Sequence, residues 1–290
     1  MRIEPETELG ARVGVAAAGP SGLRMIGRLM QRLPLLEPLS YLAAEERAMP
    51  PVDLVVVVSG MDDVTVAGDT LRAATVARGL SSVRLCVAVV PRSSLASTPE
   101  VLGTLREVGQ LVDALFLVSH RNLKPLYPDA PRMMAELALE EFLSTTMIED
   151  LTRIITERGL ICIDFADVVA ILRDGSSETC LGVGLAGGKG GAALAAEKAV
   201  QSIREQGGEP SQHGAFLVCV KGSTNITMDD FDDASRVVHE NVHPDANIII
   251  GLLLDDDLGS NVRVLIMAKK DAVPVAPVVD ERVRRFLGQT

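Results

Sequence analysis

Two aspartates three residues apart, Asp164 and Asp167, stand in the otherwise apolar stretch GLICIDFADVVAIL (159–172). A carboxylate of this kind can position and polarise a water molecule. Burying an unpaired carboxylate is costly, so each side chain needs a partner or contact with solvent. Two interpretations are open: the pair forms an acidic loop aimed at another molecule, or it caps the helix expected over VVAILRD (168–174).

The composition excludes several classes of function. The chain has 290 residues, of which 47% are hydrophobic and 23% charged, as is typical of a folded globular protein. Its formal net charge of −11 argues against nucleic-acid partners and acidic membrane surfaces, because both require a basic face. No run approaches the ~18 apolar residues of a membrane span, and the acidic start is unlike a signal peptide. We therefore expect a cytoplasmic protein without a membrane span.

Cysteine and histidine spacing predicts no metal site. Cys86, Cys162, Cys180 and Cys219 are widely scattered in apolar runs, with no CxxC pair, and are expected to be buried small hydrophobes. His239 and His243 could share a helix face, but Pro244 follows and no third ligand is evident.

Apolar runs alternate with helical patterns in the first half of the chain. Val-rich runs that are apolar on both faces, joined by helices, predict a mostly parallel sheet covered on both sides. Strands are expected at 11–19, 53–60, 82–91 and 114–120, and helices at 21–33, 67–80 and 98–112, the last capped by Thr98 with Glu100 in its first turn.

A second α/β region follows one long helix, expected at 133–158 and ended by Gly159. The expected strands are a short one at ICIDF (161–165) and longer ones at 215–222, 246–255 and 263–270, and the expected helices lie at 190–206 and 228–242. The acidic runs DDFDD (229–233) and LDDD (254–257) are taken as solvated loop ends or helix caps.

Four pieces of the second half stand in the order and spacing of one known family. GLICIDFADV, GVGLAGGKGGAALAAEKAV, GAFLVCVKGSTNITMDDF and ANIIIGLLLDDDLGSNVRVLIMA together resemble FtsZ, the bacterial and archaeal relative of tubulin. The resemblance implies a tubulin/FtsZ-like α/β fold: a Rossmann-like parallel-sheet N-terminal domain (1–132), a central helix (133–158) and an α/β C-terminal domain (159–270), followed by a tail (271–290).

The resemblance also gives the aspartate pair a role. In FtsZ, acidic residues after the central helix enter the neighbouring subunit's nucleotide pocket and orient the water that attacks GTP. The matching positions are Asp164 and Asp167, which would therefore act in trans. The family's asparagine two residues before the first of these is Cys162 here.

The phosphate-binding loops of the family are degenerate in this chain. The first is AAAGPSG (16–22), which keeps Gly19 and Ser21 but contains Pro20, which has no N–H to donate. The second is GMDDVTVAG (60–68), which keeps Gly60, Thr65 and Gly68 and places Asp62 and Asp63 where the family has glycines.

A carboxylate facing a phosphate would cost about 4 kcal/mol at ~4 Å, against roughly 8 kcal/mol for micromolar binding. A magnesium ion held by the same aspartates would reverse that sign.

Guanine recognition looks altered as well. The family's base-reading and stacking positions align near Glu141 and Leu137, and Leu137 cannot stack; only AAEERAMPPV (43–52) replaces a long loop. No cofactor is therefore expected, with GTP and Mg possible if the pocket works. The glycine-rich GVGLAGGKGG (182–191) does not meet P-loop spacing and is expected to connect into a helix.

Three functions remain open. The first is a pseudo-GTPase that caps or modulates FtsZ-like filaments, or scaffolds them, through its acidic loop. The second is an atypical active FtsZ-like GTPase that assembles head to tail with itself. The third is a non-polymerising scaffold for division or other proteins. The apolar and basic tail RVRRFLGQT (282–290) faintly resembles the FtsZ peptide that recruits division proteins.

Overall fold

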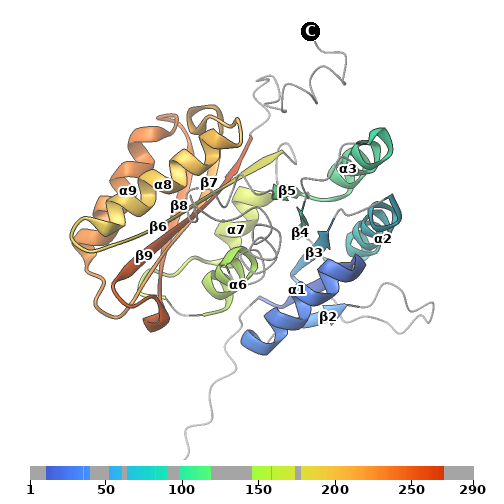
Figure 1. Ribbon diagram of the computed structural model, residues 1–290, viewed down its shortest axis with the longest axis horizontal. Coiled ribbons are helices and arrows are strands. Elements are labelled where there is room, and N and C mark those ends of the chain that lie inside the picture. The colour runs from blue at the N-terminus through green and yellow to red at the C-terminus, as the bar shows by residue number, and fades with distance from the viewer. Residues whose placement is uncertain are drawn as a thin grey trace, which may run out of the picture.

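The computed structural model describes residues 11–34, 36–39, 52–60, 64–81, 83–89, 98–118, 146–157, 159–173 and 178–270. These residues form two β-sheets, each with helices on its outer face, and two further helices lie between the sheets (Figure 1).

The first sheet is entirely parallel, in the order β2-β1-β3-β4-β5. Every residue of β3 is buried, which explains its uninterrupted valine run: the sheet is covered on both faces. The parallel sheet predicted for the first half is confirmed. Its strands are β1 (Val13–Ala18), β2 (Glu37–Leu39), β3 (Leu54–Gly60), β4 (Val83–Val89) and β5 (Ala114–Val118).

Three helices cover this sheet. Helix α1 (Gly19–Arg32) packs Met25, Ile26 and Leu29 on one face, whereas α2 (Val64–Leu80) and α3 (Pro99–Leu111) cover the other. Helix α3 begins as predicted, since the Thr98 hydroxyl accepts a hydrogen bond from the Val101 N–H at 3.4 Å and Glu100 lies in the first turn.

The second sheet is mixed, in the order β6-β9-β7-β8: β9 runs antiparallel to both of its neighbours, whereas β7 and β8 form a parallel pair. Its outer face packs on α8 (Gly191–Glu205) and α9 (Met228–Asn241), which Figure 1 shows side by side. Its strands are β6 (Thr179–Gly187), β7 (Ala215–Gly222), β8 (Asn247–Leu254) and β9 (Asn261–Lys269), with short 3-10 turns η3 (Pro210–Gln212) and η4 (Asp256–Leu258).

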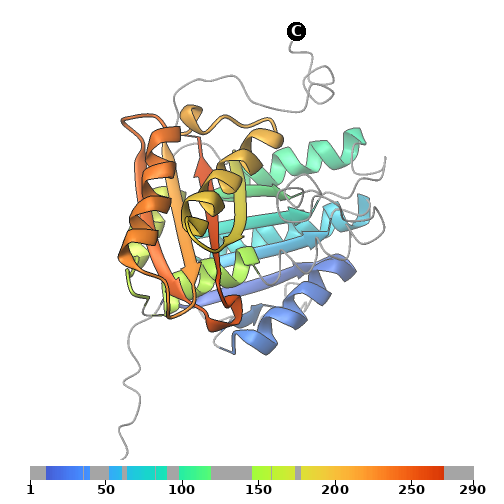
Figure 2. The ribbon, with the colours of Figure 1, turned by 60° about the vertical axis from the view of Figure 1, so that its left-hand side comes forward.

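Helices α6 (Ile148–Thr156) and α7 (Phe165–Leu172) fill the space between the two sheets (Figures 1 and 2). Buried Ile148 and Leu151 of α6 and Val168 of α7 belong to one apolar core that reaches both sheets. Among the described residues, no helix is long and apolar enough to cross a membrane.

Two sequence predictions are corrected here. Residues 179–187 form the edge strand β6 and not a simple connection; Gly182 and Gly184 lie so close to α8 that an added Cβ would stand 2.4 Å from the Ala199 oxygen and 1.9 Å from the Ala195 oxygen. The stretch ICIDF is not a strand, because only Ile161 makes an isolated β-bridge, to Leu252.

Several predictions lie partly outside the described residues. The structure describes the last turns of the expected central helix as α6, whereas 133–145 and the tail 271–290 are not among the described residues. The domain boundaries stay predictions.

Two glycines of α1 give opposite expectations for the same substitution. A Cβ at Gly22 would lie 2.4 Å from the Val58 carbonyl oxygen of β3, whereas a Cβ at Gly27 meets nothing within 4 Å. We expect Gly22→Ala to lower the free energy of unfolding by about 1–3 kcal/mol. Gly27→Ala should raise it by about 0.5–1 kcal/mol, because glycine weakens a helix interior. Urea unfolding followed by circular dichroism measures both; equal shifts of the same sign would contradict the close packing of α1 on β3.

Candidate functional site

The strand order locates one candidate crevice. Helices α1 and α2 follow the adjacent strands β1 and β3 and lie on opposite faces of the sheet. In open parallel sheets, ligands bind outside the carboxyl ends of the strands at such a switch point. The degenerate phosphate loops identified from the sequence leave β1 and β3 at this place, so the structure brings the two segments together.

The first turn of α1 forms one wall of the crevice. Gly19 adopts a left-handed conformation with φ +72°, and Pro20 follows in the first turn without an N–H. Ser21 is buried, and its hydroxyl accepts a hydrogen bond from Arg24 Nη2 at 2.7 Å. The N-cap residue, Ala18, has no polar side chain. This helix start therefore has fewer donors for an anion than a glycine nest would offer.

The first turn of α2 closes on the first turn of α1. The buried Val66 side chain lies against Gly19, because a Cβ there would stand 2.7 and 2.8 Å from its two methyl carbons. The helix is fixed to β3 by a buried 2.6 Å hydrogen bond between the Ser59 and Thr70 hydroxyls. An apolar side chain thus packs on the first residue of α1, at the turn where the sequence predicts the first phosphate loop.

The remaining residues predicted for this site are separated. Gly60 is the buried last residue of β3, Thr65 is exposed in the first turn of α2, and Gly68 lies within that helix with open space beside it. Asp62, Asp63, Leu137, Glu141 and most of 43–52 lie outside the described residues.

The aspartate pair lies at the start of α7. Asp164 is the N-cap, and its Oδ1 accepts a hydrogen bond from the Ala166 N–H at 3.3 Å. Asp167 completes a capping box, since its Oδ2 accepts from the Asp164 N–H at 3.4 Å. The capping interpretation of the sequence is therefore confirmed as the local structure.

The capping bonds leave carboxylate oxygens of both aspartates available to other molecules. Both residues are exposed, and the bonds from the Ala166 N–H to Asp164 and from the Asp164 N–H to Asp167 each use one oxygen of the carboxylate. Leu160, which is 56% exposed, and the exposed Cys162 lie beside them in the same loop. Residues 160–167 therefore present two carboxylates and an apolar side chain outward, and their role toward another molecule stays a prediction.

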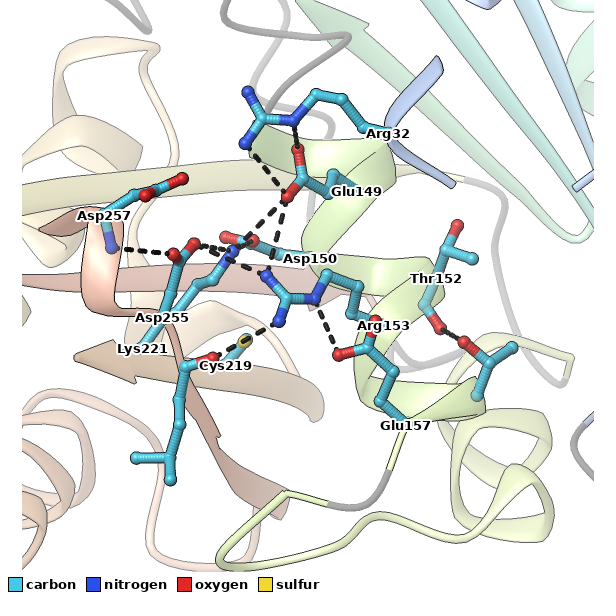
Figure 3. Close-up of polar contacts among 12 residues, drawn as sticks. Arg32, Glu149, Asp150, Thr152, Arg153, Glu157, Cys219, Lys221, Asp255 and Asp257 are labelled. Carbon is cyan, nitrogen blue, oxygen red and sulfur yellow. Dashed lines mark hydrogen bonds and ion pairs between the residues drawn. The ribbon is translucent and has the colours of Figure 1, made fainter. Parts of the chain in front are cut away.

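A buried cluster of charges fixes the helix before this loop (Figure 3). Lys221 of β7 is fully buried, and its Nζ lies 3.0 Å from Asp150 Oδ1 of α6 and 2.7 Å from Asp255 Oδ2 after β8. Arg263 of β9 donates to both oxygens of the fully buried Asp150, at 2.9 and 2.7 Å. Helix α6 is thus tied to three elements of the second sheet.

Arg153 joins the cluster to the start of the loop. Its guanidinium donates to Glu157 Oε2 at 2.7 Å and to the Leu254 carbonyl oxygen at 3.2 Å. At the other end of α6, Arg32 of α1 pairs with Glu149 at 2.9 Å, which reaches the first sheet's helix layer. These contacts set the position from which residues 157–164 depart.

The cluster gives the fold a dependence on pH. Burial on its own raises the pKa of Asp255, but the hydrogen bond and charge of Lys221, the Asp257 N–H and Arg153 together lower that pKa below its usual value. A carboxyl whose pKa is lower in the folded state adds stability above its unfolded pKa of about 3.9. That contribution is lost as the pH falls through the lowered, folded-state pKa.

Sequence reasoning missed this cluster. Lys221 ends the apolar run AFLVCVKG, and nothing in that run identifies Asp150, 71 residues earlier, as its partner. The one available indication in the sequence was a lysine next to the last residue of a strand that is otherwise apolar.

The cysteine prediction is correct for some positions and wrong for one. Cys86 and Cys219 are buried and Cys180 is partly buried, whereas Cys162 is exposed. Burial raises the pKa of the Cys86 thiol to about 12 and that of Cys180 to about 11.

Comparisons with known proteins agree with this architecture. Residues 177–270 match the model of the FtsZ family, C-terminal domain. The chain is 30% identical over 166 residues to the cell division protein FtsZ 1 of Rhizobium meliloti, a match that covers 57% of the chain and 28% of that relative. It is 29% identical over 222 residues to the cell division protein FtsZ of Mycoplasmopsis pulmonis, covering 74% of the chain and 55% of that relative.

Among solved structures, the fold is similar to an empty FtsZ dimer from M. jannaschii. The TM-score is 0.79 at 19% sequence identity, and the match covers 94% of this chain and 96% of that chain. The match to the curated relatives spans at most about half of their length.

The charge cluster yields a stability prediction. Asp150→Asn leaves Lys221 and Arg263 with one fewer buried counter-charge, and we expect it to lower the free energy of unfolding by about 3–5 kcal/mol. The matched control is Asp233→Asn, which removes one partner of the exposed Arg236 pair and should leave stability unchanged within error. Denaturant unfolding at pH 7 measures both; an Asp150→Asn variant as stable as the parent would show that the cluster does not hold α6.

The loop yields a reactivity prediction. In the native protein, a thiol reagent such as DTNB should modify Cys162 rapidly, while Cys86 and Cys219 react only after unfolding. The variant Cys162→Ser should lack the fast phase. In the denatured state it should have one reactive thiol fewer than the parent. A fast phase that survives in Cys162→Ser would contradict the exposure of this loop.

Proposed function

We propose, from the premise that the chain is a divergent FtsZ/tubulin-like protein, that it is a pseudo-GTPase that caps or modulates filaments of an FtsZ-like partner in the cytoplasm. In this proposal the loop with Asp164 and Asp167 docks on the nucleotide-bearing end of the partner. The chain's own crevice holds no GTP.

The acidic loop supports the first part of this proposal, that the chain docks on a partner. Asp164 and Asp167 are exposed, and the capping box holds them in a fixed orientation at the start of α7. The buried cluster around Lys221 holds the preceding helix, so the loop departs from a rigid base. Carboxylates alone can only orient a water molecule; the cations and N–H donors that phosphoryl transfer needs must come from the partner.

The crevice between β1 and β3 supports the other half. One observation carries the proposal: the Val66 side chain packs on Gly19 at the predicted first phosphate loop, while the acidic loop stays exposed. Pro20 removes a further donor from the same helix start. Head-to-tail filament contacts are heterologous, so a subunit with one working face can join an end and stop further addition.

The test mixes the purified protein with an active FtsZ and follows polymer mass and GTP turnover. We expect both to fall at sub-stoichiometric ratios, because one docked molecule closes one filament end. The double variant Asp164→Asn/Asp167→Asn isolates charge from folding, since asparagine caps a helix about as well as aspartate. It should keep the parent's stability and lose the effect on filaments.

Two results would overturn the proposal. No effect on polymer mass or turnover at any ratio would remove the capping function. GTP found in the purified protein, with turnover abolished by Asp167→Ala, would favour the active self-assembling GTPase.

A further inference from the structure

The edges of the second sheet are unequally covered. On the outer edge at β6, Gln206 Nε2 donates to the Leu181 carbonyl oxygen at 2.6 Å and Lys198 Nζ donates to that of Leu185 at 2.9 Å. At the opposite edge, β8, Leu252 exchanges two backbone hydrogen bonds with Ile161, at 3.0 and 3.4 Å. Side chains and loop backbone therefore cover one edge and the end of the other.

The first half of β8 is open. In a parallel pair, the N–H and C=O of one residue point to the same side, and the side alternates along the strand. Because Leu252 points outward, Ile248 and Ile250 do too, and neither residue's outward N–H or C=O has a partner within the described part of the chain. Their side chains and that of Ile249 are only partly buried. An apolar edge of this kind is a template for another strand.

We propose that residues 276–280 of this chain's own C-terminal tail add to β8 as a fifth, parallel strand. The described chain leaves the sheet at the correct end: Lys269 is paired with Ala215, which is paired in turn with Asn247, the first residue of β8. A tail that turns around this end and follows the open edge runs parallel to β8.

The reach is sufficient. The added strand lies three strand spacings from β9, or about 14 Å. The eight residues from Lys270 to Val278 span up to about 26 Å, which also allows for the three residues along β8 to the level of Ile249. The run 275–279, VAPVV, is small and mostly β-branched, as an added strand requires.

One register satisfies every open group. In this register Val278 lies opposite Ile249. The Val278 N–H donates to the Ile248 carbonyl oxygen, and the Val278 carbonyl oxygen accepts from the Ile250 N–H. The Ala276 C=O accepts from the Ile248 N–H, and the Asp280 N–H donates to Ile250 O. Pro277 falls at a position whose nitrogen faces solvent, where an edge strand tolerates proline.

Charge favours the tail as the occupant of this edge. Beyond residue 280 the tail carries Arg282, Arg284 and Arg285. The loop that covers Leu252 continues to the exposed carboxylates Asp164 and Asp167. A tail that runs parallel to β8 carries these cations toward that loop, where the opposite charges attract.

The test measures residue-resolved amide hydrogen exchange in the full chain, with two matched proline variants. Ile248 and Ile250 amides should be protected in the parent and in Val279→Pro, whose substituted N–H faces solvent. In Val278→Pro, which removes a donor to β8, their exchange should speed up tenfold or more. The Ile249 and Gly251 amides, which point toward β7, should be unchanged in all three.

Two outcomes would overturn the proposal. Unprotected Ile248 and Ile250 amides in the parent would mean that no strand adds to this edge. Protection that is the same in Val278→Pro as in the parent would assign the edge to another segment. Protection that rises with protein concentration would assign it to a second copy. Neither outcome bears on filament capping, which is measured separately.

Discussion

The contact between Lys221 and Asp150 joins helix α6, which lies between the two sheets, to strand β7. It lies among four cations, Lys221, Arg32, Arg153 and Arg263, and four carboxylates, Glu149, Asp150, Asp255 and Glu157. A buried ion pair adds little net stability compared with apolar packing, but breaking one is costly. An orientation of α6 that separated Asp150 from Lys221 and Arg263 would leave buried charges without partners, so the cluster disfavours it.

The position of the acidic loop follows from that orientation. Helix α6 enters the loop at Glu157, Ile161 joins the edge of β8, and Asp164 begins α7. Because the aspartates are both helix caps and outward charges, the local fold is compatible with the recognition role proposed for them. A cap needs an oxygen directed at backbone N–H groups, and an interface needs charge that remains in solvent.

Local patterns predicted what depends on local physics. The valine runs gave the parallel sheet, because strands buried on both faces need no alternation, and Thr98 gave the start of α3. Strand β6 could not be predicted: its glycines suggest a loop, and only the packed structure shows that Gly182 and Gly184 admit the backbone of α8. The charge cluster was equally hidden, since Asp150 lies 71 residues from Lys221 and 113 residues from Arg263 along the chain.

The same limit applies to the crevice. From the sequence, the proline and the acidic residues suggested that phosphate binding was impaired by lost donors and added charge. The described residues add an observation of a different kind, the apolar contact of Val66 with Gly19, from a residue that carried no chemical signal in the sequence. A phosphate-binding helix start must keep its N–H groups open to solvent until the ligand arrives. In this chain the first residue of α1 instead packs on the Val66 side chain, and the proposed loss of GTP binding rests on that contact together with Pro20.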